Sequence, residues 1–291
     1  MKLILNKLFM VKSKMSHAKN IVISFQFKGD FCQTDLLDHL LKVFAPWNFT
    51  KTEIHYTIDE SSSKSLKFKS RGGVVNAKTL NNFRNNVKQC DRKLFKIDGF
   101  WLVSNTPDWK YRSIDTEFEA DYTIDDGYNN GINRLNFSFD VEKNKDFNPK
   151  LFIANDILPF LLSKNCELLY GFVFACEKRK MPLVNLVGIH TEFLDKYEDN
   201  KVQIWSDNLQ NCGTKIWDVF WGNIISKGHL EKVETNYIER KCGKENVKML
   251  APDLLWFNLP EDLTNFQFSK FSWKRRMLYQ HFKKLGMVMD N

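Results

Sequence analysis

The stretch RLNFSFDVEKNKDFNPKLFIANDILPFLLSKNCELLYGFVFAC, residues 134–176, decides the fold prediction. Residues 134–142 alternate apolar and polar side chains, which is typical of a half-buried strand, and residues 167–176 form the apolar run of a buried strand. Residues 148–164 between them predict a helix with Pro149 in its first turn, and Pro159 predicts a kink or break in that helix. We therefore expect a strand–helix–strand unit here.

The same order occurs near the N-terminus, where residues 20–27 predict a strand, residues 33–47 a helix and residues 51–59 a strand. Two such units make an α+β fold with mixed or antiparallel sheets, and the repeated order allows an internal duplication. We divide the chain into a basic N-terminal extension (1–19), an N-terminal α+β half (20–131) and a C-terminal α+β half (132–291). Further predicted elements are helices over 80–90 and 273–285 and strands over 98–105, 117–126, 181–190, 200–207 and 252–259.

Residues 213–226, GTKIWDVFWGNIIS, raise the choice between an aromatic-walled ligand site and a buried packing element. On a helical wheel, Ile216, Val219, Phe220 and Ile224 share one face and the two tryptophans lie on an adjacent one. This pattern favours a helix over 214–226 that is buried on most sides.

Composition and charge narrow the function classes. The chain has 291 residues, 43% of them hydrophobic and 14% aromatic, which excludes a disordered protein. Its formal charge of +8 comes from basic ends, because residues 1–28 hold six lysines and no acid, and residues 269–291 hold six Lys/Arg and one Asp. The body between them is slightly acidic, whereas a nucleic-acid binder usually has a basic face built into its fold.

The cysteines and the N-terminus indicate a cytoplasmic protein. Six widely spaced cysteines without a C-x-x-C motif are typical of reduced cysteines and give no paired ligands for zinc. The N-terminal apolar stretch is broken by Asn6 and Lys7 and lacks a signal-peptide cleavage site. The start could lie at Met1, Met10 or Met15.

No motif that carries a catalytic mechanism is present. The sequence has no phosphate-binding glycine loop, no zinc-protease motif and no nucleophile elbow. The turn-rich DDGYNNG (125–131) lacks calcium-loop spacing, and the Glu239–Lys241 spacing of a metal nuclease is better explained by a solvated face. His190 and Glu192 would share one face of a strand and could form a base oriented by a carboxylate. We expect no enzyme activity, catalytic residue, metal or cofactor, and keep a hydrolase around His190 and Glu192 as an alternative.

Aromatic residues in polar loops are the candidate partner-binding residues. Trp109 and Tyr111 lie in NTPDWKYRS (105–113), where burial is not assured, and Tyr128 lies in the turn-rich loop. Such side chains are enriched at the centres of protein interfaces. The C-terminal helix is basic and amphipathic, with Met277, Leu278, Phe282 and Leu285 on its apolar stripe, and we expect it to dock on the core.

Four stretches carry a family resemblance: IDGFWLVSN (97–105), ELLYGFVFACEKRKMPLVNLVGIHTEF (167–193), KIWDVFWGNIISKGHLEKV (215–233) and PDLLWFNLPEDL (252–263). Their order resembles the immunity proteins of bacterial polymorphic toxin systems, in particular the group labelled immunity protein 52. The resemblance implies a non-enzymatic protein that binds and blocks a cognate protein toxin. The alternative is a protein that binds or processes nucleic acid through its basic termini.

Overall fold

The computed structural model describes residues 20–29, 32–47, 51–59, 68–90, 96–104, 118–123, 131–176, 208–263 and 273–289. Within these ranges one ten-stranded sheet runs through the molecule in the order β3-β2-β4-β5-β6-β1-β7-β8-β10-β9. Every pairing between neighbouring strands is antiparallel. The α+β class is thus confirmed, in its antiparallel form.

The strands are β1 (Asn20–Lys28), β2 (Thr52–Asp59), β3 (Phe68–Val74), β4 (Lys96–Ser104), β5 (Phe118–Thr123), β6 (Ile132–Asp140), β7 (Glu167–Cys176), β8 (Gly222–Ser226), β9 (Val247–Ala251) and β10 (Leu254–Asn258). β1 lies between β6 and β7, so it is surrounded by strands of the C-terminal half. The predicted strands near 20–27, 51–59, 98–105, 117–126, 134–142, 167–176 and 252–259 are all present.

The helices are α1 (Gln33–Phe44), α2 (Ala77–Cys90), α3 (Pro149–Phe152), α4 (Leu158–Ser163), α7 (Lys227–Leu230), α8 (Thr235–Cys242) and α9 (Trp273–Lys284). Single turns of tighter helix cover Ala45–Trp47, Leu209–Asn211 and Lys244–Asn246. Both predicted units, β1-α1-β2 and β6-α3-α4-β7, run strand–helix–strand. The internal duplication itself stays a prediction.

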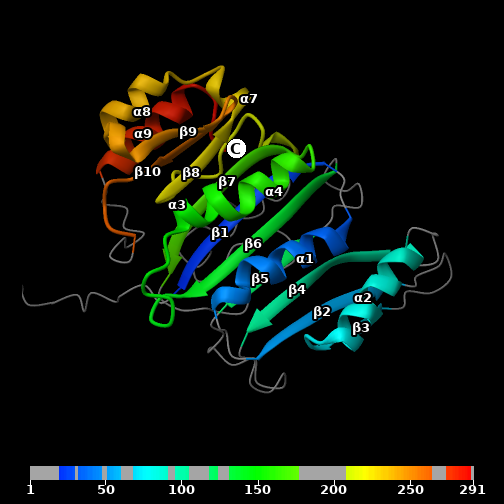
Figure 1. Cartoon of the computed structure of the whole chain (residues 1–291). Helices are drawn as coiled ribbons and strands as arrows, with labels where there is room; N and C mark the ends of the chain where they lie inside the picture. The colour runs from blue at the N-terminus through cyan, green and yellow to red at the C-terminus, as the bar shows by residue number, and fades with distance from the viewer. Residues whose placement is uncertain are drawn as a thin grey trace, which may run out of the picture.

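Alternation along the strands divides the core into two layers. In β1, Ile23 and Phe25 belong to the core layer that also contains the buried residues of α1, α2, α3 and α4, whereas Val22 faces the opposite layer. Likewise Trp256 of β10 joins the first layer and Phe257 the second. Strands buried on both faces explain the continuous apolar runs in the sequence. Figure 1 shows α8 and α9 beside β8 to β10, at the opposite end of the sheet from α2.

The helix predicted over 148–164 is present but interrupted. It consists of α3, a five-residue wide turn over Ile153–Ile157 and α4. Pro159 lies in the first turn of α4, where its missing N–H group is tolerated, and the widened turn precedes it. The predicted break at Pro159 is therefore confirmed, and its form is a local π-helical turn.

The helix predicted over 214–226 is wrong. Gly222–Ser226 form strand β8, with Ile224 facing one layer and Ile225 the other, and the residues before it are irregular. Asn223 accepts a hydrogen bond from the Phe220 N–H group at 3.1 Å and donates one to the Phe220 carbonyl at 2.9 Å. These side-chain bonds satisfy the backbone locally in place of a helical ladder. A short strand that is buried on both faces has apolar residues at successive positions, as a buried helix does, so periodicity does not distinguish the two.

The strands β3 and β9 and the helices α7 and α8 were not predicted. β3 and β9 end the sheet at either side, so each has one strand neighbour and partly exposed side chains. β3 also contains Gly72 and Gly73, which are unfavourable in an ordinary strand. The predicted strands over 181–190 and 200–207 lie outside the described residues.

Candidate functional site

The residues predicted to bind a partner lie outside the part of the chain that the structure describes. These are Trp109, Tyr111 and Tyr128, and the same holds for His190 and Glu192. Their roles therefore stay predictions. Three other features of the described residues carry chemistry: a histidine–carboxylate pair on β2, an exposed face on α8 and α9, and a polar hollow beside α2.

A histidine–carboxylate pair of the kind expected at His190 and Glu192 lies on β2. The carboxylate of Glu53 lies 3.1 Å from Nε2 of His55 and 2.8 Å from Nζ of Lys51. Burial lowers the pKa of His55 and outweighs the opposing effect of the Glu53 carboxylate. Burial would raise the pKa of Glu53, but the hydrogen bonds from Lys51 and His55 bring it below its ordinary value.

The surroundings of His55 favour a packing role over a catalytic one. A Cβ atom placed on Gly72 would lie 2.5 Å from Nδ1 of His55, so β3 passes directly against this nitrogen. Nε2 is already engaged with Glu53. Both ring nitrogens are thus covered or bonded, and a general base needs one that can reach a substrate proton.

The second feature is the α8–α9 face, formed by Tyr237 and Lys241 of α8 and by Trp273, Met277 and His281 of α9. The spacing of four residues within each helix places these side chains on one side of it. Trp273 is 60% exposed and Met277 40% exposed. Exposed apolar side chains that lie next to one another, as these two do one turn apart on α9, are typical of contact sites.

Aromatic rings and cations are interleaved on the α8–α9 face. The Tyr237 and His281 rings stack with centroids 3.7 Å apart, and Nζ of Lys241 lies 5.4 Å from the Tyr237 ring and 6.0 Å from the Trp273 ring. Arg240 also approaches Tyr237, at 5.8 Å. Burial lowers the pKa of His281, and the neighbouring Lys284 and Lys241 add to this effect against Glu234. The stacked imidazole is therefore neutral at pH 7, and the charge of this face comes from its lysines and arginines.

The opposite side of α9 fixes the face in place. Leu278 and Phe282 are fully buried in the second core layer. Arg275 donates from Nη2 to the buried Asp218 carboxylate at 2.5 Å and from Nε to the Val219 carbonyl at 2.9 Å. The predicted docking of this helix is confirmed. Met277, however, lies outside the buried stripe, which frees it for a partner.

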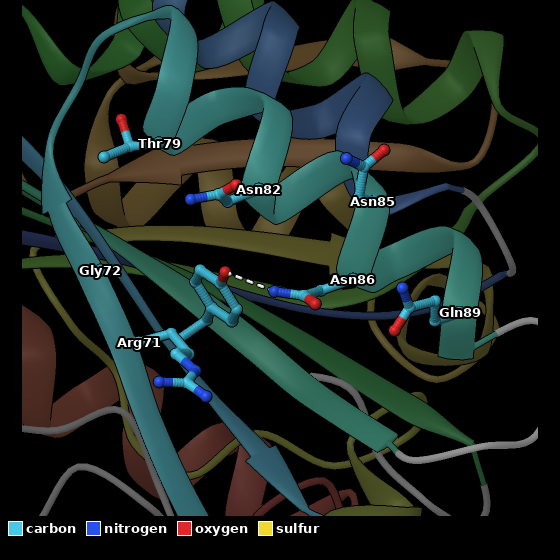
Figure 2. A pocket seen from close by; sticks show the side chains of 8 residues that line it. Arg71, Gly72, Thr79, Asn82, Asn85, Asn86 and Gln89 are labelled. Carbon is cyan, nitrogen blue, oxygen red and sulfur yellow. Dashed lines mark hydrogen bonds between the residues drawn. The ribbon is translucent and has the colours of Figure 1, made fainter.

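The third feature is the α2–β3 hollow, a cavity of about 420 Å³ between α2 and the strands β2 and β3. Figure 2 shows Asn82 and Asn86 on α2, with Arg71 on the strand side. At its base, Asn86 Nδ2 donates to the Tyr56 phenol oxygen at 2.7 Å. The lining residues are Tyr56, Arg71, Gly72, Thr79, Asn82, Asn85, Asn86 and Gln89.

The sequence holds a signal for the hollow and for the α8–α9 face, although neither matches a catalytic motif. Residues 68–90 contain five Lys/Arg and no Asp or Glu, a basic stretch inside the body that charge counting over the whole middle region concealed. On the α8–α9 face, Trp273, Met277 and His281 recur at every fourth residue. Such a stripe cannot be told from a core stripe until the rotation of the helix on the sheet is known.

No described helix is long and apolar enough to cross a membrane. The described residues also contain no group of three or more His, Cys, Asp or Glu side chains arranged to hold a metal ion.

Comparison with known proteins finds a likeness in fold. No family model matches its sequence, and no curated protein does. A solved structure with a similar fold is the Pseudomonas aeruginosa T6SS protein PA0821, with a TM-score of 0.54 and 9% sequence identity. The match covers 94% of this chain and 75% of that one, so the likeness extends over nearly the whole fold.

Proposed function

We propose that this chain is a non-enzymatic immunity protein, which binds a cognate bacterial protein toxin through the α8–α9 face and blocks it. The observation that carries the proposal is the exposure of Trp273 and Met277 beside Lys241 on a helix that the core holds rigidly. Aromatic residues, Met and Arg are enriched at protein interfaces, and a few such anchors supply most of the binding energy.

The fold supports a secretion-system context for this role. PA0821 is described as a protein of the type VI secretion system, and its likeness to this chain spans both halves of the sheet. A toxin–immunity pair in such a system is consistent with the family resemblance, which covers residues 98–265. The group labelled immunity protein 52 remains the proposed family.

The chemistry of the face indicates what the toxin surface presents. Lys241 lies beside the Tyr237 and Trp273 rings and Arg240 beside Tyr237, so a complementary surface would carry carboxylates around an apolar pocket for Trp273. Charge complementarity would accelerate the encounter, and burial of the indole would slow dissociation. A rigid helix face loses little conformational freedom on binding.

Growth rescue tests the proposal. The protein encoded by the adjacent reading frame is expressed in a heterologous host with this chain, and we expect growth only when both are present. Trp273→Ala should reduce the rescue, whereas Lys88→Glu, an exposed charge reversal on α2, should leave it intact. Failure of the wild-type chain to protect against the products of both flanking frames would refute the proposal.

A further inference from the structure

We infer that the α2–β3 hollow is a binding site for a small phosphate monoester. This site is independent of the α8–α9 face, because β3 and β9 end the sheet on opposite sides. Its volume of about 420 Å³ falls in the range of roughly 300–1,000 Å³ that is typical of small-molecule sites.

The hollow presents hydrogen-bond donors and a fixed positive charge. None of the described residues that line it is acidic, and residues 68–90, which supply most of its wall, contain no Asp or Glu. Among the described residues, Arg71 has no carboxylate at ion-pair distance, in contrast to Arg84 on the same unit, which pairs with Asp38 at 2.6 Å. A free guanidinium offers the planar fork that phosphate oxygens match.

Tyr56 gives the hollow a buried polar base. Its side chain is 3% exposed, and its phenol oxygen accepts the hydrogen bond from Asn86 Nδ2. Because the oxygen already serves as acceptor, the phenol proton is left to donate, and within the described ranges the phenol donates no hydrogen bond to a protein group. Burial is the main cause of the raised pKa of Tyr56, so the phenol keeps this proton at neutral pH.

The amides indicate that the ligand has a polar body as well as a phosphate. Asn82, Asn86 and Gln89 lie one turn apart along α2, and their carbonyl oxygens can accept from hydroxyl or amino groups. A carboxylate would carry only one negative charge, and a neutral sugar would leave Arg71 without a counter-charge. A nucleoside monophosphate and a sugar phosphate both satisfy these groups, so the shared chemistry is the phosphate monoester.

Calorimetric titration of the full chain with four probes tests the assignment: adenosine monophosphate, ribose 5-phosphate, inorganic phosphate and adenosine. We expect the monophosphates to bind at one site at least about tenfold more tightly than adenosine. If adenosine monophosphate binds more tightly than ribose 5-phosphate, the site also contacts the base. If the two bind equally, the sugar phosphate is sufficient for binding.

Variants distinguish a defined binding site from nonspecific attraction to positive charge. Arg71→Gln should weaken monophosphate binding by at least about tenfold, and Tyr56→Phe by a few-fold, because each removes donors to the phosphate. Lys78→Gln, an exposed cation of the same unit outside the lining, should bind like the wild type. In ¹⁵N spectra, the side-chain amide signals of Asn82, Asn86 and Gln89 should shift on binding.

Two results would overturn the inference. One is the absence of heat and of amide shifts with every phosphate probe at about 10 mM, well above the affinity expected of a specific site. The other is an equal loss of binding in Lys78→Gln and Arg71→Gln, which would show attraction to charge without a defined site. Unchanged thermal unfolding of Arg71→Gln ensures that a loss of binding is not a loss of fold.

Discussion

His229 is a buried residue that couples stability to pH. Its Nδ1 atom accepts a hydrogen bond from the Ser226 N–H group at 3.2 Å, which closes the first turn of α7. This bond requires the unprotonated nitrogen. Burial is the main reason that the pKa of His229 falls from its ordinary 6.5 to about 4. The folded state therefore binds fewer protons than the unfolded state between these two values.

Stability should consequently fall as the pH is lowered from 6.5 toward 4, by up to roughly 3 kcal/mol from this residue. In His229→Gln the amide oxygen can keep the bond to Ser226 without titrating. Urea unfolding at several pH values should give a flatter profile for the variant. Equal pH slopes for the two proteins would contradict the assignment.

Arg275 and Asp218 form a buried ion pair whose loss should be costly. The Asp218 side chain is 2% exposed, and Arg275 also bonds to the backbone beside it. Arg275→Met removes the charge-assisted hydrogen bond from Arg275 to this buried carboxylate, so we expect a loss of about 3–5 kcal/mol in the free energy of unfolding. Chemical denaturation measures this loss. Lys284→Met, an exposed change on the same helix, should cost under about 1 kcal/mol; equal costs for both would refute the role of the pair.

At the scale of the element, β8 depends on a residue without a side chain. A Cβ atom on Gly222 would lie 2.5 Å from Cη2 of Trp256 and 3.2 Å from Cβ of Val173. Both neighbours are fully buried, so neither can move away cheaply. Gly222 thus allows the edge of the Trp256 indole on β10 to approach the backbone of β8 closely.

Gly222→Ala should therefore destabilise the protein by about 1–3 kcal/mol through overpacking. Thermal unfolding should show the lower midpoint, and near-ultraviolet circular dichroism should report the displaced indole. Gly213→Ala is the matched control, because its Cβ would meet only Leu169 Cδ2, at 3.3 Å. A Gly222→Ala protein as stable as the wild type would exclude close packing at this position.

Sequence patterns identified helices best where one face of the helix is buried and the other is exposed. α1 and α2 each bury one stripe and expose the opposite side, so their spacing was sufficient. β8 is buried on both faces and was mistaken for a helix, since a short apolar run has no diagnostic period. β3 and β9 carry weak patterns because edge strands are half exposed.

At the scale of the whole molecule, the sites depend on contacts that sequence alone does not give. Arg71 and Asn86 become neighbours of one cavity only because β3 folds back on β2 beneath α2. Lys241 and Trp273 meet because two helices pack on the same sheet end. The candidate partner residues Trp109, Tyr111 and Tyr128 are aromatic residues of predicted loops, whereas Trp273, a strongly exposed aromatic residue of the described part of the chain, lies on helix α9.

The whole fold decides how the nucleic-acid alternative can be tested. Removing residues 270–291 would delete the whole of α9, including the core residues Leu278 and Phe282, so loss of binding would reflect unfolding. Charge substitution of Lys283 and Lys284 is the cleaner test. If the alternative holds, the affinity for single-stranded DNA should fall in this variant and its salt dependence should become shallower.

The affinity of the purified chain for the purified product of the adjacent reading frame tests toxin binding most directly. We predict a one-to-one complex of micromolar affinity or tighter, with Trp273→Ala weaker by about thirtyfold or more and Lys88→Glu unchanged. Absence of a complex at micromolar concentrations would contradict the immunity role, and a tight complex indifferent to Trp273→Ala would contradict the α8–α9 face as its site.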